Sequence, residues 1–365
     1  MNSKYTNLDV LRSLAVLSVV VQHFWRQCYF FHLIDFNPLI NQIVGNISFT
    51  GVMFFFVHTC LVLMLSMQRS ASPCLWRSFM IRRAFRIFPL CWATILLALS
   101  TGLSDQRGGN IASLGWQGVA ANVLLLQNIA NKFSSAIGPL WSLPWEMQMY
   151  LVLPVFFVIL RKYDRLAVVF SFWLGATVLA VAVIRPGLPR MFHAALYPPM
   201  FIGGMVAYKL LSRRTSVQRF LKVPAGIWPF FVISLFTAQA FLMGRHEFES
   251  TPGIIIDSCV CLVLALAIPV FNEMSLPWIV RPAQEIAKYS YGVYLLHVPA
   301  LIFVLRYLPG LSLFMKVVAF LFLTALMAVG SYHVIEDPLI RFGKTLATRL
   351  ADSAAPSFIR PPEIA

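Results

Sequence analysis

Charged residues are scarce in this chain. Only 12% of its 365 residues are charged and only 14 are Asp or Glu, whereas soluble domains carry about 25% charged residues. The six cysteines form no CxxC pair, which argues against a zinc site or a disulfide framework. Signatures of a P-loop, a dinucleotide-binding glycine loop, an HExxH helix and a GxSxG turn are also missing. Any chemistry must therefore be assembled between helices, and no metal site is predicted.

Apolar residues take the place of the missing charges. Hydrophobic residues make up 59% of the chain and its mean hydropathy is +0.76, against roughly 45–50% apolar usage in soluble domains. This composition excludes a soluble enzyme, a disordered protein and a nucleic-acid-binding domain. The net charge of +15 does not indicate a nucleic-acid partner, because cytoplasmic loops of membrane proteins accumulate Lys and Arg. The composition predicts an all-α, polytopic helical membrane protein.

About ten transmembrane helices are expected, because a helical span needs about 20 mostly apolar residues. The stretches of that kind lie at residues 8–27, 47–67, 87–103, 141–160, 166–184, 194–211, 226–243, 253–271, 287–306 and 312–335. The segment 115–130 is too short and polar for a span and is expected to be interfacial or re-entrant. No soluble domain is inserted. We expect one transmembrane domain over residues 1–344 and a flexible cytoplasmic tail over 345–365.

Lys and Arg indicate the orientation. The first apolar run keeps Asp9 and Arg12 and shows no cleavage site, so it is interpreted as a retained span and not a signal peptide. With the N-terminus in the cytoplasm, 20 basic residues fall on the inside and 8 on the outside. This bias predicts that both termini are cytoplasmic and that the number of spans is even.

The first span contains ionisable residues, which are costly in a membrane and are functional candidates by default. Arg12 and His23 are eleven residues apart, which places them on one helix face about 16 Å apart along the axis. Two plainer interpretations stay open: Asp9 and Arg12 form a local ion pair at the helix end, and His23 bonds a neighbouring helix in a structural role.

Arginines gather before the third span. The stretch 77–88 reads RSFMIRRAFRIF, and Arg82, Arg83 and Arg86 are helical neighbours without a nearby acid. Guanidinium groups bind phosphates through paired donors, so this cluster is a candidate anion site. The alternative is a positive-inside loop or a lipid-headgroup anchor.

The fourth and ninth spans carry the other candidates. The fourth opens with WSLPWEMQMYLVLP, in which Glu146 lies about a turn inside the membrane and Trp141 and Ser142 lie at its start. The alternative is a hydrated interfacial Glu146 with tryptophan belt residues around it. The ninth contains SYGVYLLHVP, with Tyr291 in its inner half and His297 near mid-membrane. At the end of the tenth span, Glu336 and Asp337 are interpreted as a helix terminus stopped by Pro338.

These motifs together resemble the membrane-bound acyltransferase family 3, the O-acyltransferases of bacterial glycans that include the O-antigen acetylases. The resemblance runs from residue 8 to about residue 344 in the family's order. It is carried by LDVLRSLAVLSVVVQH at 8–23, the arginine cluster, WSLPWEMQMYLVLP at 141–154, SYGVYLLHVP at 290–299 and IEDPLIR at 335–341. The Arg-x10-His pairing of the family is met by Arg12 and His23.

The chain departs from the family pattern in the second span. Residues 51–63 read GVMFFFVHTCLVL, in which Met53 replaces an acidic residue and His58-Thr59-Cys60 replaces a Leu-Ser-Gly stretch. Met147 replaces the second glutamate of the fourth-span motif. These departures predict a divergent subfamily.

The resemblance implies a multi-pass enzyme of the bacterial inner membrane that acylates a hydroxyl at the periplasmic side. It implies that the co-substrate is an acyl-CoA, most often acetyl-CoA, and that no cofactor stays bound. The implied acceptor is a glycan or a lipid-linked saccharide. The other expected partners are membrane lipids, and no nucleic acid is expected. By resemblance His23 is the catalytic base, with an acyl-histidine as the alternative mechanism, and Glu146 and Arg12 complete the catalytic set. Donor and substrate binding then fall to a second set of residues: Arg82, Arg83, Arg86, Trp141, Ser142, Tyr291 and His297.

Two other classes remain as alternatives. A transporter or flippase of a glycan or lipid precursor also places His and Glu inside the membrane, but the sequence shows no convincing inverted repeat. A non-enzymatic scaffold would not need His23 on the face of Arg12. The oligomeric state and the acyl chain are not determined.

Overall fold

A computed structural model describes residues 5–35, 37–69, 75–103, 114–129, 135–184, 190–213, 222–244 and 246–353. Within these ranges the chain is helical and contains no β-strand, and one isolated bridge pairs Val223 with Phe271. Because a bilayer offers no partners to backbone amides, a chain this apolar must satisfy them within helices. The expected all-α polytopic class is confirmed.

The helices follow the predicted order. They are α1 (Thr6–Phe30), α2 (Pro38–Arg69), α3 (Leu75–Thr101), α4 (Gly115–Val123), α5 (Leu143–Lys162), α6 (Leu166–Val183), α7 (Pro198–Arg213), α9 (Trp228–Met243), α10 (Thr251–Ala267), α11 (Pro277–Tyr307), α12 (Leu313–Ser331) and α13 (Asp337–Ser353). Short 3-10 turns cover Gly138–Trp141, Arg190–Leu196 and Ala225–Ile227, and a π-helical turn covers Tyr332–Glu336. In the described part of the chain, nine helical segments have the length and hydropathy of a span. The eighth predicted span corresponds to α10, which is apolar but only 17 residues long.

Two helix boundaries differ from the sequence analysis. The helix α3 begins at Leu75, so the arginine stretch is its first half and not a loop before it. The interpretation of Pro338 as a helix stop is wrong, because the π turn leads directly into α13. In that turn the Asp337 N–H donates to the Tyr332 carbonyl, and Pro338 follows in the first turn of α13, where a missing N–H costs little. Residues 345–353 are therefore helical, and the rest of the predicted tail lies outside the described residues.

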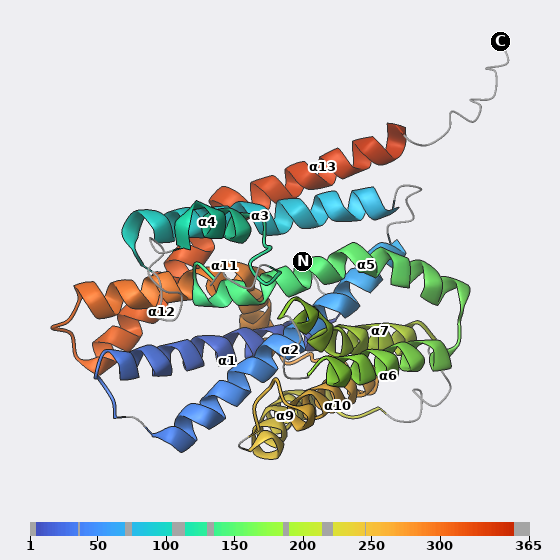
Figure 1. The fold of residues 1–365 in the computed structure, drawn as a ribbon, viewed down its shortest axis with the longest axis horizontal. Helices are drawn as coiled ribbons and strands as arrows, with labels where there is room; N and C mark the ends of the chain where they lie inside the picture. The colour runs from blue at the N-terminus through green and yellow to red at the C-terminus, as the bar shows by residue number, and fades with distance from the viewer. Residues whose placement is uncertain are drawn as a thin grey trace, which may run out of the picture.

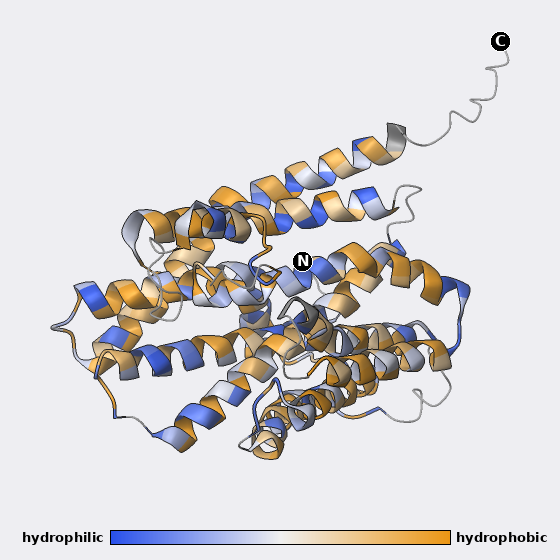
Figure 2. Ribbon diagram, in the orientation of Figure 1, coloured by the Kyte–Doolittle hydropathy of each residue, from blue (hydrophilic) through white to orange (hydrophobic). Residues whose placement is uncertain are grey.

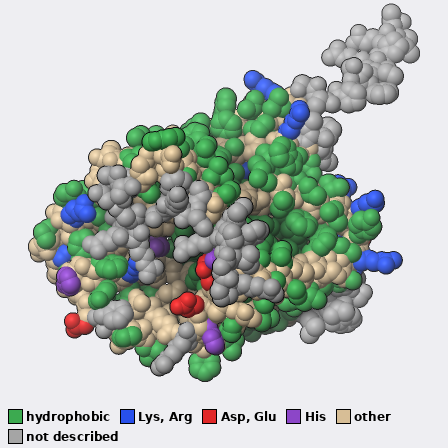
Figure 3. Space-filling model, viewed as in Figure 1, with side chains coloured by type: hydrophobic (Ala, Val, Ile, Leu, Met, Phe, Trp, Pro, Cys, Tyr) green, Lys and Arg blue, Asp and Glu red, His purple; other side chains and the backbone are tan. Residues whose placement is uncertain are grey.

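The helices are arranged around α1, α2 and α11 (Figure 1). The helix α1 packs on α2 and α11, α12 packs on α11, and α13 lies beside α3. On the other side α2 contacts α7, which packs with α6 and α10. Hydrophobic residues colour most of α6, α9 and α10, whereas α3 and α13 carry a mixed pattern (Figure 2). In the space-filling view hydrophobic side chains cover most of the face, and Lys and Arg lie toward its ends (Figure 3).

Glycine permits a close contact between α2 and α7. A Cβ built on Gly204 of α7 would lie 2.6 Å from the Cβ of Cys60 and 2.9 Å from the backbone nitrogen of Leu61, both on α2. Only a residue without a side chain lets the two backbones approach this closely, as is common between membrane helices. This contact fixes α2, which forms one wall of the site.

The start of α1 is tied to the segment before α11. The side chain of Asn7 donates to the Asn272 carbonyl at 2.8 Å and accepts from the Met274 N–H at 3.0 Å. The Asn7 N–H donates to Glu273 Oε2 at 2.9 Å, so a distant carboxylate caps the helix. Burial raises the pKa of Glu273, and the bond from Asn7 partly offsets that rise. These bonds hold α1 in register with α11.

Candidate active site

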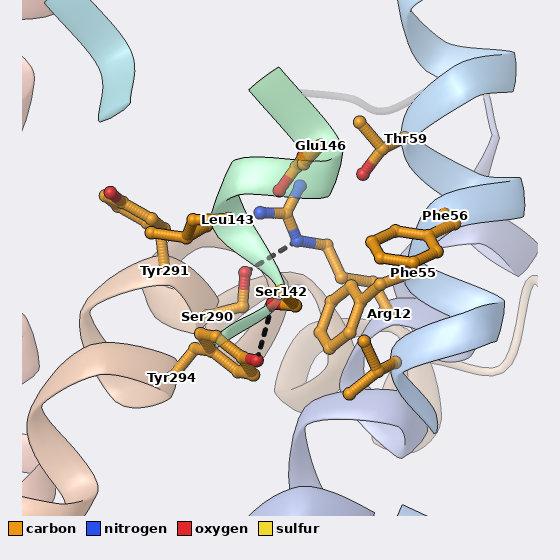
Figure 4. Close-up of a pocket in the computed structure, with 11 residues that line it drawn as sticks. Arg12, Phe55, Phe56, Thr59, Ser142, Leu143, Glu146, Ser290, Tyr291 and Tyr294 are labelled. Carbon is orange, nitrogen blue, oxygen red and sulfur yellow. Dashed lines mark hydrogen bonds between the residues drawn. The ribbon is translucent and has the colours of Figure 1, made fainter. Parts of the chain in front are cut away.

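A polar cavity lies between α1, α2, the start of α5, and α11. Its cavity volume is about 70 Å³, enough for a few water molecules or a small polar group. Its lining residues are Arg12, Val52, Phe55, Phe56, Thr59, Ser142, Leu143, Glu146, Ser290, Tyr291 and Tyr294. Figure 4 shows the Arg12 side chain extending between the start of α5 and the phenylalanines of α2. We call this space the inner cavity.

A second cavity adjoins the first and reaches α3. The two cavities share Arg12, Thr59, Glu146 and Tyr291, and the second adds His58, Arg83, Arg86, Ile87 and Tyr150, with Val62 and Leu63. We call it the arginine cavity. The shared residues place the arginines of α3 and the inner cavity on two sides of the same walls, which include Arg12.

Arg12 is the residue that joins the elements of the site. Its Nε donates to the Ser290 hydroxyl at 2.6 Å, and that hydroxyl donates to the Ala287 carbonyl at 2.8 Å. In Figure 4 the carboxylate of Glu146 and the hydroxyl of Thr59 lie on either side of the guanidinium. Because one donor of five is committed to Ser290, Arg12 retains donors for a bound group.

Glu146 is bound within its own helix. The Tyr150 hydroxyl donates to Glu146 Oε1 one turn further along α5. The carboxylate also interacts electrostatically with Arg12, Arg83 and Arg86. Glu146 therefore balances the arginines of the cavity, and the structure does not place it as the hydrogen-bond partner of His23.

The three predicted arginines of α3 have different surroundings. Arg83 lines the arginine cavity, and its buried Nε has no hydrogen-bond partner among the described residues. Arg86 lies 2.9 Å from Glu336 Oε2 and sits over the ring of Tyr291 at 5.5 Å. Arg82 instead donates through Nε to the Ser78 carbonyl at 3.0 Å and is not part of the cavity walls described here.

The charges at this site do not cancel. Arg12, Arg83 and Arg86 face two carboxylates, Glu146 and Glu336. With all five groups ionised, one positive charge is in excess, and Arg83 Nε–H is an unused donor. A buried group of this kind needs an acceptor, so the arginine cavity is suited to an anion.

His23 and His297 form a hydrogen-bonded pair between α1 and α11. His23 Nδ1 lies 3.0 Å from His297 Nε2, and the centroids of the two rings are 4.9 Å apart. His297 Nδ1 lies 2.9 Å from the Val293 carbonyl. Because a carbonyl oxygen only accepts hydrogen bonds, His297 Nδ1 carries the proton. In a neutral His297 ring, Nε2 is then a hydrogen-bond acceptor. His23 Nδ1 then donates to His297 Nε2, and to the Val19 carbonyl at 3.1 Å. In this tautomer Nε2 of His23 carries no hydrogen.

The predicted face of α1 thus meets one face of α11. Ser290, Tyr294 and His297 are spaced i, i+4 and i+7, which places them on one side of a helix. Ser290 meets Arg12 and His297 meets His23. His23 stands next to His297 beyond Tyr294 and is not among the lining residues of the two cavities.

Other predicted residues divide between the cavity and the core. The Ser142 and Tyr294 hydroxyls are 2.8 Å apart at the inner cavity. Tyr291 lines both cavities and donates to the Ile87 carbonyl at 2.6 Å. Trp141 instead stacks on Phe49 with centroids 5.8 Å apart and does not appear in either cavity wall.

The sequence-based set lacks several polar residues of the site, among them His58, Tyr150, Ser290, Tyr294 and Glu336. His58 is a buried histidine in a span, a signal that the sequence analysis registered only as a departure from the family. Tyr150 and Tyr294 lie inside the quoted motifs, one turn from Glu146 and Ser290. Glu336 is only 1% exposed and is paired with Arg86. Nothing in the residues around Glu336 in the sequence distinguishes this buried carboxylate from one at the membrane interface.

Fold and site together define a multi-pass helical membrane protein with buried polar cavities. The chain belongs to acyltransferase family 3, whose family model, described as an acyltransferase domain, matches residues 5–336.

The relatives match nearly the whole chain. A Bacillus subtilis protein with the provisional name peptidoglycan O-acetyltransferase YrhL is 27% identical over 91% of this chain and 54% of its own. O-acetyltransferase OatA of Staphylococcus aureus is 26% identical over 92% of this chain and 57% of its own. Regulator of hypoxia-inducible factor 1 of Caenorhabditis elegans is 22% identical over 96% and 82%. The chain thus spans little more than half the length of YrhL and OatA. No solved structure matches it.

Proposed function

We propose that the chain is an inner-membrane O-acyltransferase that moves an acetyl group from acetyl-CoA to a hydroxyl of a glycan. The donor arrives from the cytoplasm and the acceptor, a cell-envelope or lipid-linked saccharide, from the periplasmic side. The observation that carries the proposal is the excess positive charge of the arginine cavity beside Arg12 and the histidine pair. The names of YrhL and OatA support an O-acetyl transfer and a glycan acceptor.

Donor binding falls to the arginines. The phosphates of CoA are strongly anionic, and Arg83 and Arg86 offer buried charge and the unused Nε–H donor. The pantetheine arm then extends through the shared walls into the inner cavity, where Arg12 holds the thioester end. Binding CoA in this way supplies the counter-charge that the site lacks.

His23 acts as general base in this proposal. Its Nε2 takes the proton of the acceptor hydroxyl while the hydroxyl oxygen attacks the thioester carbonyl carbon. The C–S bond then breaks, and the CoA thiolate takes the proton back from the imidazolium. His297 fixes the tautomer of His23 through Nδ1, the role that a carboxylate has in other catalytic systems.

The test compares glycans of a strain that lacks the gene, complemented with wild type or with His23→Ala at matched membrane levels. Mass spectrometry of envelope and secreted glycans should show one acyl increment with wild type only. A positioned base contributes about 10²–10⁴-fold, so the variant should leave at most about 1% of the product. His246→Ala, a change at an exposed histidine away from the site, is the control. Equal acylation by wild type and His23→Ala would exclude His23 as the base.

A further inference from the structure

The Ser142–Tyr294 pair holds a hydrogen that nothing in the described part of the chain uses. The two hydroxyl oxygens are 2.8 Å apart, and either one is able to donate. Two hydroxyls carry two hydrogens, and one bond between them uses one hydrogen. No other partner of either hydroxyl is present among the described residues. Whichever hydroxyl accepts therefore keeps its own hydrogen free.

This free hydrogen is in the inner cavity. Ser142 is 4% exposed and Tyr294 is 7% exposed, and both line the cavity that Arg12 enters (Figure 4). A buried donor without an acceptor is unfavourable, because it has lost its hydrogen bond to water and gained none in the protein. A ligand oxygen placed in this cavity therefore gains a hydrogen bond from the pair at no cost in reorganisation.

The start of α5 adds a second source of positive potential. Ser142 is the residue before the 20-residue helix, its side chain makes no capping bond, and Leu143 of the first turn lines the same cavity. The N-terminus of an α-helix carries about half a positive charge. The dipole and the hydroxyl pair thus act on the same space.

The neighbouring groups locate the reacting centre. The rings of Tyr294 and His297 have centroids 6.4 Å apart, and His297 bonds His23. Arg12 lines the same cavity and is held by Ser290, one turn of α11 before Tyr294. Along α11, Tyr294 therefore comes between Ser290, which bonds the donor-binding arginine, and His297, which bonds the base.

We propose that the Ser142–Tyr294 hydroxyl pair is the oxyanion donor of the acyl transfer, with the Tyr294 and Ser142 hydroxyls sharing one outgoing hydrogen bond. The inference rests on the proposed function. As the acceptor oxygen bonds to the carbonyl carbon, the carbonyl π electrons move to oxygen, and this oxyanion accepts the free hydrogen. When the C=O bond re-forms, the C–S electrons leave with the CoA sulfur, which is protonated by His23.

Kinetics provide the first test. Removing one oxyanion donor in an acyl-transfer enzyme lowers kcat about 10²–10³-fold. Tyr294→Phe and Ser142→Ala should each lower the rate of acetyl-CoA-dependent acylation of an envelope glycan fraction by only a part of that factor, because the remaining hydroxyl keeps a hydrogen of its own. The double variant has neither hydroxyl and should show the full loss in kcat, with little change in KM for acetyl-CoA. Tyr289→Phe is the control, since Tyr289 is half-buried and bonds Lys288 and His333 outside the cavities.

Infrared spectroscopy separates this proposal from the proposed function. The probe is acetyl-CoA labelled with ¹³C at the carbonyl, bound to purified His23→Ala protein so that it does not turn over. The bound carbonyl should absorb at lower frequency than the free thioester, and adding Tyr294→Phe and Ser142→Ala should return the band towards the free value. A bound band with the same frequency in both proteins would overturn the oxyanion assignment and leave the acyltransferase function standing. Absence of any bound band would overturn the acetyl-CoA donor, and the oxyanion assignment with it.

Discussion

His297 should position the base without performing the chemistry, and its replacement measures this. The change is His297→Phe, which keeps an aromatic ring at a fully buried position of α11. It removes the acceptor that lies 3.0 Å from His23 Nδ1 but leaves the Val19 carbonyl at 3.1 Å from the same nitrogen. The tautomer of His23 is therefore retained by one bond where the wild type has two.

The expected decrease in kcat follows from the number of hydrogen bonds that His23 loses. One neutral hydrogen bond contributes about 1 kcal/mol net, and about 1.4 kcal/mol corresponds to a tenfold change in rate. His297→Phe should lower kcat about 5–10-fold, whereas His23→Ala removes the base and should lower it about 10²–10⁴-fold. His297→Gln places an amide oxygen near the position of the ring Nε2, and it should recover most of the loss.

The assay is the initial rate of CoA thiol release from acetyl-CoA in proteoliposomes supplied with an envelope glycan fraction. Protein amounts are matched by quantifying folded enzyme on size-exclusion chromatography. If His297→Phe is as inactive as His23→Ala, then His297 transfers a proton itself and the positioning argument is wrong. If His297→Phe has wild-type activity, the bond between the two rings has no catalytic importance.

Three further predictions concern the fold. Gly204→Ala should abolish accumulation of folded protein in the membrane, because the new Cβ would lie 2.6 Å from Cys60 Cβ. Overpacking of this kind destabilises a protein by roughly 1–3 kcal/mol or more. Normal accumulation of the variant would contradict the close contact between the two helices. Asn7→Ala should lower the melting temperature of the detergent-solubilised protein, since the two lost side-chain bonds leave an N–H and a carbonyl unpaired at about 1–3 kcal/mol each. The bond from Lys209 holds the pKa of Asp164 below its usual range, so this pair stabilises the protein above the unfolded pKa and loses its effect as pH falls through the lowered value. Wild type should therefore have a higher melting temperature than Asp164→Asn near neutral pH, and the difference should vanish in acid; a difference that persists in acid would exclude this ion pair as its cause.

Several features of the protein follow from the sequence alone. The scarcity of charge and the apolar stretches predict a helical membrane protein, because only a helix satisfies its own backbone in lipid. The eleven-residue spacing predicts that Arg12 and His23 share a face of α1, because helical geometry is local. Both meet the same helix, α11, as that shared face requires.

The pairing of these side chains depends on the tertiary structure. Glu146 was assigned to the catalytic set with His23, but it bonds Tyr150 of its own helix and interacts with the arginines, and His297 is the residue that bonds His23. Glu336 was interpreted as a helix end, but a π turn directs it into the core against Arg86. A partner more than a hundred residues away is chosen by how two helices cross and rotate. Those angles arise from packing such as Gly204 against α2, and no local pattern encodes them.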